Sequence, residues 1–321
     1  MTHIGTTLRG VTYLFCGILI LSLQDVIVKY INADYSVVQI VTIRSIVAIP
    51  ATLVLFRLEG RRGLPTTTRH TLEYVRGTFL FLAFTAYMMA VVAIPLADLA
   101  TIRNAAPLVI TLLSVLLLAE RVGTRHWLAL IVGFLGVLLI VRPGTATFNL
   151  GTIFALTATL FYCANVIITR QLRTTDSSAT MAYFSSLVYL IGSLILVPLP
   201  ILVGELPSAH PSIAFMFRAW TTTTILDFSL IVAMGFTWAV GMYLLARAYS
   251  TVQASVVAPF EYIALPISAM WGFALWNEIP TLATWVGAAL TVGSGLYVLY
   301  LDQQGSDDPA PAPASPSPET G

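Results

Sequence analysis

Charged residues are scarce in this chain. Asp, Glu, Lys and Arg make up 10% of its 321 residues, whereas hydrophobic residues make up 57% and the mean hydropathy is +0.86. A soluble domain carries roughly 25% charged residues, so this chain has too few to cover a surface that faces water. The shortage excludes an ordinary water-soluble fold and predicts an all-α polytopic membrane protein whose surroundings are the lipid bilayer.

Cysteine and histidine are also rare. The two cysteines, Cys16 and Cys163, fall inside apolar stretches, no CxxC pair is present, and the four histidines lie in loops or at the terminus. This pattern excludes a disulfide framework and gives no reason to expect a metal ion or another cofactor. A net charge of +1 gives no reason to expect a nucleic acid partner. The sequence lacks a GxxxxGK[ST] loop, so nothing in it indicates primary energy coupling by a nucleotide.

Long apolar runs make up most of the sequence. A membrane-spanning helix needs about 20 mostly apolar residues, and the first run continues past Gln24 and Asp25 without a cleavage site, so we interpret it as a retained span rather than a signal peptide. The sequence predicts ten spans: 11–31, 36–56, 74–94, 98–118, 126–141, 150–170, 180–200, 226–247, 252–275 and 281–301.

Two segments fall outside these spans. Residues 204–224 form the longest external loop, and we expect a short surface helix within it. From residue 302 the composition changes to Pro, Ala, Ser and acidic residues. Such a segment cannot form a core, so residues 302–321 are predicted to be a disordered tail.

Basic residues predict the orientation in the membrane. With the N-terminus in the cytoplasm, the inner side receives eleven arginines and the outer side only Lys29, Arg142 and Arg218, while Arg44 and Arg103 remain inside spans. Positive residues concentrate on the cytoplasmic side of membrane proteins. Both termini, and therefore the tail, are expected in the cytoplasm.

The two halves of the chain repeat one another. Glu120 precedes Trp127 by seven positions, as Glu278 precedes Trp285, and both matches have an offset of 158. A Tyr-x-x-Ala motif at Tyr87 reappears at Tyr243. Two copies of five spans must be oppositely oriented because five is odd, which predicts an inverted repeat with a site between the halves. The expected units are residues 1–145, residues 146–301 and the tail.

These motifs allow a family to be named. Residues 107–144, PLVITLLSVLLLAERVGTRHWLALIVGFLGVLLIVRPG, and residues 254–280, ASVVAPFEYIALPISAMWGFALWNEIP, resemble the first-half and second-half signatures of the EamA-type drug/metabolite transporters. The resemblance covers about residues 10–300. It implies ten spans in a bacterial inner membrane and secondary transport of small organic solutes, commonly export; some such carriers instead import scavenged metabolites such as S-adenosylmethionine. The halves differ where Asn165 answers Asp25 and Thr169 answers Lys29.

The ninth span contains an acid where a membrane helix should be apolar. Glu261 lies about 14 Å into that span, at 1.5 Å per residue, between Pro259 and Pro266. A buried charge in a span is costly and indicates a functional site, and the nearby prolines predict an interrupted helix. Asp25, Arg44 and Arg103 occupy overlapping depths on three other spans, so we expect all four to face a common interior.

Two interpretations of these four charges stay open. In the first, Arg44 and Arg103 bind an anionic group of a substrate, because a guanidinium matches a carboxylate or phosphate. Glu261 and Asp25 would then bind an amino group or carry a coupling proton. In the second, the pairs Asp25–Arg44 and Glu261–Arg103 are structural ion pairs that hold the halves together.

Weaker candidates for substrate binding are Asn104, Asn165, Tyr87 and Tyr243. Buried amides also serve as hydrogen-bonding links between helices, and tyrosines inside spans more often pack than bind ligands. Glu120 and Glu278 are interpreted as helix-end residues.

The sequence therefore favours an alternating-access secondary transporter for amino-acid-like, zwitterionic or amphiphilic solutes, with efflux and proton coupling expected. The alternatives are an importer of a scavenged metabolite and, more remotely, a membrane-embedded enzyme or a channel. Small-residue faces at Gly133/Gly136 and at Gly287/Gly293/Gly295 are compatible with a monomer or a homodimer.

Overall fold

The computed structural model describes residues 2–106, 108–110, 112–113, 123–144, 148–172, 175–206, 210–251 and 258–306. Within these ranges the chain is helical and contains no strand. This agrees with the predicted fold class, because in a bilayer the backbone must satisfy its own hydrogen bonds and a helix does so within one segment.

The first half supplies five described helices. Ser36 precedes the second of them, and its side chain accepts a 3.2 Å hydrogen bond from the backbone N–H of Gln39, which satisfies one of the free donors of the first turn. The helices are α1 (Thr2–Ile31), α2 (Val37–Leu58), α3 (His70–Val91), α4 (Leu96–Arg103) and α6 (Thr124–Val141).

The second half is built similarly, with additional short helices in the long loop. Ser177 caps α8 as Ser36 caps α2, by accepting a hydrogen bond from the N–H of Thr180. The elements are α7 (Leu150–Leu172), α8 (Ser178–Leu196), α9 (Pro198–Val203), α10 (Pro211–Phe217), α11 (Ile225–Thr251), the 3₁₀ helix η1 (Ala258–Ile263), α13 (Ala264–Trp276) and α14 (Leu282–Ser306). The short helix expected in the loop is therefore present as α10.

Two predicted spans are interrupted inside the bundle. α4 ends at Arg103, and a turn at Asn104 and Ala105 follows it. The ninth predicted span begins its described part as η1, which contains Glu261, before continuing as α13. The sequence predicted the second interruption but not the first. Each break lies beside a charged residue, and non-helical backbone at membrane depth is tolerated where it is buried in protein or lines a cavity.

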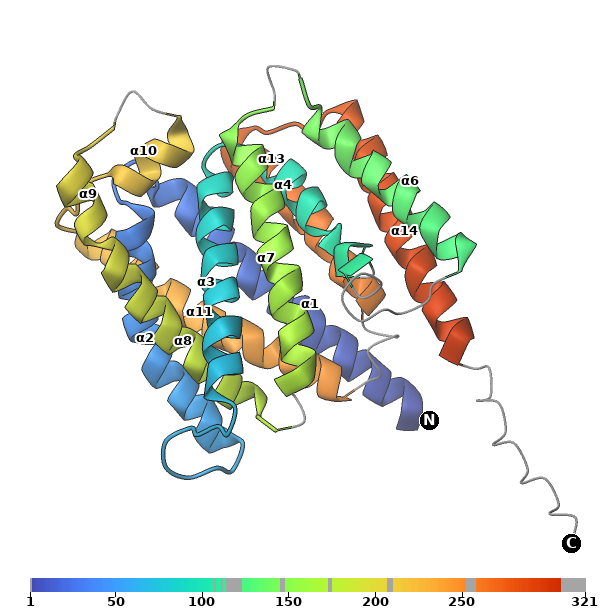
Figure 1. Ribbon diagram of the computed structural model, residues 1–321, viewed down its shortest axis with the longest axis horizontal. Coiled ribbons are helices and arrows are strands. Elements are labelled where there is room, and N and C mark those ends of the chain that lie inside the picture. The colour runs from blue at the N-terminus through green and yellow to red at the C-terminus, as the bar shows by residue number, and fades with distance from the viewer. Residues whose placement is uncertain are drawn as a thin grey trace, which may run out of the picture.

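The helices pack as pairs drawn from the two halves. α1 lies along α11, α3 along α7, α2 along α8, α4 against α13, and α6 along α14 (Figure 1). The α6–α14 contact is close because glycines face each other. A methyl group on Gly136 would lie 2.7 Å from the Gly287 carbonyl oxygen, and one on Gly287 would lie 2.6 Å from the Gly136 carbonyl oxygen. Gly136 and Gly287 therefore pack against each other within one chain, whereas a methyl group on Gly293 would meet no described atom within 4 Å.

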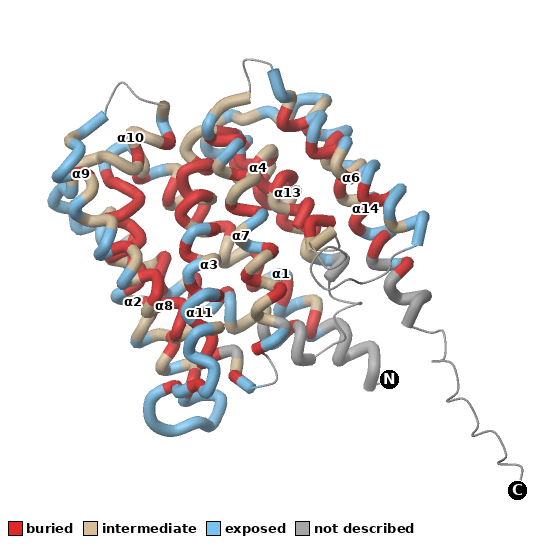
Figure 2. Tube along the Cα trace, viewed as in Figure 1, coloured by how far each residue is buried: buried red, intermediate tan, exposed pale blue. Residues whose placement is uncertain are grey.

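Polarity is distributed as a bilayer requires. Buried residues concentrate between the helices and exposed ones on the outside of the bundle (Figure 2). Ile201, Leu202 and Leu282 expose 78%, 80% and 80% of their surfaces, whereas Arg44 exposes 2% and Glu73 none. Large apolar residues on the outside and charges inside are unfavourable in water but suit a protein surrounded by lipid.

Seven described helices are long and apolar enough to span a membrane: the α1 segment Arg9–Ile31, α2, α3, α6, the α7 segment Leu150–Thr169, Ala179–Val203 and the α11 segment Ile225–Leu245. The protein is thus a multi-pass membrane protein. The arrangement of ten spans as an inverted repeat stays a prediction. The boundary of the tail needs correction, since α14 continues through Ser306; the backbone bonds that define a helix carry on for another turn into polar sequence. Residues 307–321, the rest of the expected tail, lie outside the described residues.

Candidate functional site

Three of the predicted site residues meet in the middle of the bundle. The Tyr87 hydroxyl on α3 donates a 2.9 Å hydrogen bond to Asp25 Oδ2 on α1. The Arg103 guanidinium, at the end of α4, lies 5.6 Å from the centre of the Tyr87 ring and interacts electrostatically with the Asp25 carboxylate. An acid, a phenol and a guanidinium from three helices therefore share one environment.

Glu261 belongs to the same environment. Arg103 interacts electrostatically with Glu261 of η1 and with Tyr162 of α7, as well as with Asp25 and Tyr87. We call these five residues the central cluster: Asp25, Tyr87, Arg103, Tyr162 and Glu261. Arg103 is its only described cation, and it faces two carboxyl groups. Tyr162 is the cluster residue with a large exposed fraction, 41% of its surface.

Two buried amides lie close in the sequence to residues of the cluster. Asn104 follows Arg103 directly and exposes 9% of its surface, and Asn165 on α7 exposes 6%. Asn104 Nδ2, Asn165 Oδ1 and the Tyr262 hydroxyl have no hydrogen-bond partner among the described residues. Buried polar atoms are normally paired. The Asn104 donor, next to Arg103, and the Asn165 acceptor, three residues after Tyr162 on α7, are therefore suited to bind a polar ligand.

Arg44 lies apart from the central cluster. Its guanidinium carbon sits 3.9 Å from the Phe84 ring centre, 5.2 Å from that of Tyr189 and 5.6 Å from that of Trp238. Its Nη1 donates a 3.2 Å hydrogen bond to Gln24 Oε1. We call Arg44 with these rings and Gln24 the aromatic cage.

The cage corrects one expectation from the sequence. The Asp25–Arg44 ion pair is absent from the described residues, where Arg44 has no carboxylate within ion-pair distance. The two residues were matched by depth alone. Helix rotation separates them, because the residue of α1 that meets Arg44 is Gln24, and Asp25 points toward Tyr87 instead.

Tyr243 is a half-buried residue of α11, the helix that packs along α1. It keeps its status as a candidate on the strength of its match with Tyr87.

One end of the bundle carries an ion pair that the sequence did not predict. Lys29 Nζ bonds to Glu278 Oε1, and it lies 5.2 Å from the centre of the Trp276 ring. The other carboxylate oxygen of Glu278 accepts a 3.1 Å hydrogen bond from the backbone N–H of Leu96, the first residue of α4. Glu278 was interpreted as a helix-end residue, and it is one, but it also joins three helices. Lys29 follows Asp25 by one helical turn, and this spacing could have indicated a second charged contact on the same face of α1.

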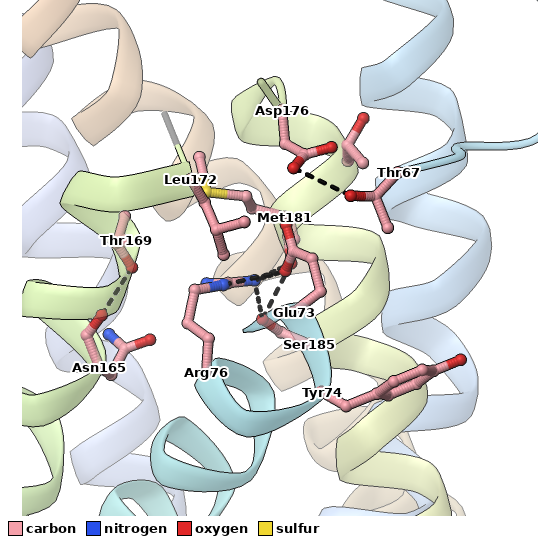
Figure 3. Close-up of polar contacts among 12 residues, drawn as sticks. Thr67, Glu73, Tyr74, Arg76, Asn165, Thr169, Leu172, Asp176, Met181 and Ser185 are labelled. Atoms are coloured by element: carbon pink, nitrogen blue, oxygen red, sulfur yellow. Dashed lines mark hydrogen bonds and ion pairs between the residues drawn. The ribbon is translucent and has the colours of Figure 1, made fainter. Parts of the chain in front are cut away.

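The opposite end of the bundle contains a second polar group (Figure 3). Arg76 on α3 donates a 3.0 Å hydrogen bond from Nε to Glu73 Oε2, a 2.8 Å bond from Nη2 to Ser185 Oγ, and a further bond to the Met181 carbonyl oxygen on α8. Nearby, Asp176 Oδ2 accepts a 3.0 Å hydrogen bond from the Thr67 hydroxyl. The sequence assigned Arg76 only to the positive inner side, so this buried pair was missed.

The central cluster offers interaction partners for charge of either sign. The described residues include no group of three or more His, Cys, Asp or Glu suited to a metal ion. Interactions are available for an anionic group at Arg103 and for a cationic group at Asp25 and Glu261, with the amides as neutral partners. Such a set suits reversible binding of a small polar molecule.

A multi-pass bundle with a charged centre is the architecture of a membrane transporter, and comparison with known proteins agrees. The chain belongs to the EamA-like transporter family, whose model matches residues 8–142 and again residues 149–300. This confirms the family resemblance predicted from the sequence.

Relatives in the family carry several kinds of molecule. The chain is 24% identical to the S-adenosylmethionine uptake transporter of Rickettsia prowazekii, over 93% of this chain and 95% of the relative. It is 28% identical to the pseudopaline exporter CntI of Pseudomonas aeruginosa, over 84% and 89% of the two chains. The riboflavin transporter of Vibrio cholerae is 28% identical over 60% of this chain and 58% of the relative. The protein is accordingly a transporter of small organic metabolites.

A solved structure also shares the fold. A crystal structure superposes with a TM-score of 0.51 over 94% of this chain and 98% of that chain, at 17% sequence identity. This similarity supports the overall arrangement of the helices.

Proposed function

We propose that the protein is a secondary active transporter for zwitterionic, amino-acid-like metabolites and that the substrate binds at the central cluster. The observation that carries the proposal is the convergence of Asp25, Arg103 and Glu261 from α1, α4 and η1. A molecule with one cationic and one anionic group can pair with both signs of charge at once. This would offset the cost of keeping these charges at membrane depth.

An inverted repeat would put this cluster where the two halves of the carrier meet. The match of one family model to each half supports units at residues 1–145 and 146–301. The packing of the helices supports the inverted repeat independently. If α1, α2, α3, α4 and α6 are exchanged with α7, α8, α11, α13 and α14, the α1–α11 contact becomes the α3–α7 contact, and the α2–α11 contact becomes the α3–α8 contact. The pairs α2–α8, α4–α13 and α6–α14 map onto themselves.

The two interrupted spans are exchanged in the same way. The break after Arg103 in α4 corresponds to the break that contains Glu261 in η1. A basic and an acidic residue therefore lie at matching interruptions, where the two halves meet. Binding at broken helices near the midplane, with one half moving against the other, is the alternating-access arrangement of inverted-repeat carriers.

The orientation proposed is N-terminus and C-terminus in the cytoplasm. The start of α1 and the end of α14 lie toward the end of the bundle away from α10 (Figure 1), as an even number of spans requires. In this orientation α10 and the ion pair of Lys29 with Glu278 face the outside, and the bacterial inner membrane is the proposed location. We propose a functional monomer, since the helices of the two halves pack against each other within one chain.

Direction and coupling follow from chemistry and similarity. Efflux with proton exchange is the main proposal, with Glu261 and Asp25 as the groups that carry the proton. They outnumber the described cation of the cluster, so a proton can balance the extra negative charge when the substrate leaves. Uptake of a scavenged metabolite such as S-adenosylmethionine is the second proposal, favoured by the match to the Rickettsia carriers over most of both chains.

Counterflow in proteoliposomes tests the proposal. Vesicles loaded with an unlabelled zwitterion would take up the same labelled compound faster than unloaded vesicles, and S-adenosylmethionine and the common amino acids form the first panel. Protein-free vesicles and vesicles that contain the Arg103→Gln variant are the controls. Saturable exchange that Arg103→Gln abolishes supports the proposal. Ohmic current without exchange would show a channel instead.

A further inference from the structure

Lys29, Glu278 and Leu96 join three helices at one end of the bundle. Both carboxylate oxygens of Glu278 are used, one by the Lys29 ammonium and the other by the Leu96 N–H. Lys29 lies in the last turn of α1, Leu96 begins α4, and Glu278 follows α13. We call these three residues the α10-end joint, because they lie at the end of the bundle where α10 is found (Figure 1).

The joint and the central cluster lie one to two helical turns apart along α1 and α4. Lys29 and Asp25 are four residues apart on α1, so they occupy the same face at a separation of about 6 Å along the axis. On α4, Leu96 begins the helix and Arg103 ends it, about 10 Å further along. The two helices that hold the charges of the cluster are therefore joined to each other, through Glu278, one to two turns away.

The joint also connects the two halves of the chain. The residue at the matching position of the second half cannot form the same ion pair. In the repeat, Thr169 stands where Lys29 does, and its hydroxyl donates a 2.8 Å hydrogen bond to the Asn165 carbonyl oxygen of its own helix. A threonine offers no cation for a carboxylate. If the halves exchange roles between the two access states, the α10 end is closed by an ion pair of Lys29, whereas the other half supplies a threonine at the matching position.

We propose that Lys29 and Glu278 are the residues that close the α10 end of the transport path and that their bond biases the carrier toward the state closed at that end. The inference rests on the proposed function, because it assumes a path through the central cluster. A ligand or mutation shifts such an equilibrium only through its different free energy in the two states. The ion pair supplies that difference, since separating α1 and α4 from α13 must break it.

The environment of the pair suits reversible opening. The side chains of Lys29 and Glu278 are 12% and 21% exposed, so water can solvate both after they separate. A fully buried pair, such as Glu73 with Arg76 at 0% and 5%, would leave uncompensated charges if it opened. Partial exposure makes the α10-end joint the one of these two pairs that can break during a cycle.

Thiol accessibility tests the inference without a known substrate. The reporter is Ala100→Cys, on the face of α4 that carries Arg103, in the Cys16→Ser/Cys163→Ala background. A membrane-impermeant maleimide is added to cells and, separately, to inverted vesicles. Thr222→Cys, in the exposed loop after α10, marks which preparation presents the α10 end.

From that side, labelling of Ala100→Cys is expected to be slow in the parent protein and roughly tenfold faster in Lys29→Met or Glu278→Gln, which corresponds to about 1.4 kcal/mol. Lys29→Arg keeps the charge and should restore slow labelling. Asp34→Asn removes an exposed charge at the same end and should change nothing. Each variant must elute as a folded monodisperse protein in size-exclusion chromatography.

Parent-like labelling in folded Lys29→Met and Glu278→Gln would overturn the inference. Faster labelling that Lys29→Arg fails to prevent would overturn it as well, because a charge pair would then not be the cause. Accessibility is measured without flux. Faster labelling in a protein that exchanges no zwitterion would therefore reject the proposed substrate class and leave the joint standing.

Discussion

Two arginines inside the same membrane bundle have opposite surroundings. Arg103 lies among two carboxyl groups and two phenols, next to a break in its helix. Arg44 is surrounded by three aromatic rings and one amide inside an unbroken helix, and it exposes 2% of its surface. Both were candidates to bind an anionic substrate, and residue type alone does not separate them.

The two arginines differ in whether the groups around them can change during a transport cycle. Arg103 interacts with groups that can exchange protons or bind a substrate amine, so its partners can change during a cycle. The faces of Phe84, Tyr189 and Trp238 cannot change their charge, and they come from α3, α8 and α11, which Arg44 ties to its own helix. We therefore assign substrate binding to Arg103 and helix organisation to Arg44, and four variants test this division.

Arg103→Gln should have the largest effect on transport. It leaves Asp25 and Glu261 without their described cation, and removing one partner of a buried charge set costs about 3 kcal/mol or more. Exchange of a zwitterion in proteoliposomes should fall at least about a hundredfold. Parent-like exchange by a folded Arg103→Gln protein would place the substrate elsewhere.

Arg44→Lys should reduce stability instead of transport. Lysine keeps the charge but loses the planar group that stacks on the Phe84 ring and is more strongly hydrated. We expect a loss of about 1–3 kcal/mol from the weakened ring contacts, seen as a lower melting temperature in detergent, with KM for exchange within about twofold of the parent. The matched variant Arg103→Lys should show the reverse, a raised KM and a smaller change in melting temperature. If Arg44→Lys instead raised KM as much as Arg103→Lys does, the cage would be part of the binding site.

Glu261→Gln tests coupling within the central cluster. The amide cannot carry a proton, so exchange should become independent of pH between about 5 and 8, and its rate should fall roughly tenfold, a typical contribution of one charge-assisted interaction of 1.5 kcal/mol. The readout is the pH profile of exchange, with Glu73→Gln, outside the cluster, as the control that should retain the parental profile. A parental pH profile in Glu261→Gln would move the coupling role to Asp25 or remove it.

Tyr87→Phe should have the smallest effect. It removes the hydroxyl that donates to Asp25 Oδ2 while keeping the ring beside Arg103. A hydrogen bond to a charged group contributes about 1.5 kcal/mol, so KM should rise several-fold with little change in maximal rate. Tyr243→Phe is the matched variant from the other half. An equal effect there would place Tyr243 in the site as well.

The sequence predicted the membrane class and the family, because composition and hydrophobic length do not depend on side-chain packing. It also predicted that Glu261 lies at a helix interruption and shares an environment with Arg103, since the repeat relates their spans. Helices α2, α3, α6, α7, α8 and α11 follow the predicted spans to within about four residues. By contrast, α1 starts early, α14 continues through Ser306, and α4 ends at Arg103, well before the predicted end of the span 98–118. The first part of the predicted span 252–275 lies outside the described residues.

The angular positions of residues on their helices could not be predicted. Asp25 and Gln24 are neighbours in the sequence but meet Tyr87 and Arg44 respectively. In a soluble protein the hydrophobic stripe of a helix indicates which side faces the core. In a membrane both sides are apolar, so that stripe is weak and depth was the only guide. The pairing of Lys29 with Glu278, and that of Glu73 with Arg76, depends on contacts between distant helices for the same reason.

The central claim is that the substrate meets Arg103 and not Arg44, and ligand-induced thermal stabilisation tests it most directly. A ligand that binds the folded state stabilises it by RT ln(1 + [L]/Kd), so the melting temperature rises with the logarithm of the ligand concentration once that concentration exceeds Kd. With a zwitterion that stabilises the parent protein, Arg44→Lys should start from a lower melting temperature and show the parental shift, whereas Arg103→Gln should show none. A parental shift in Arg103→Gln, or its loss in Arg44→Lys, would contradict the account.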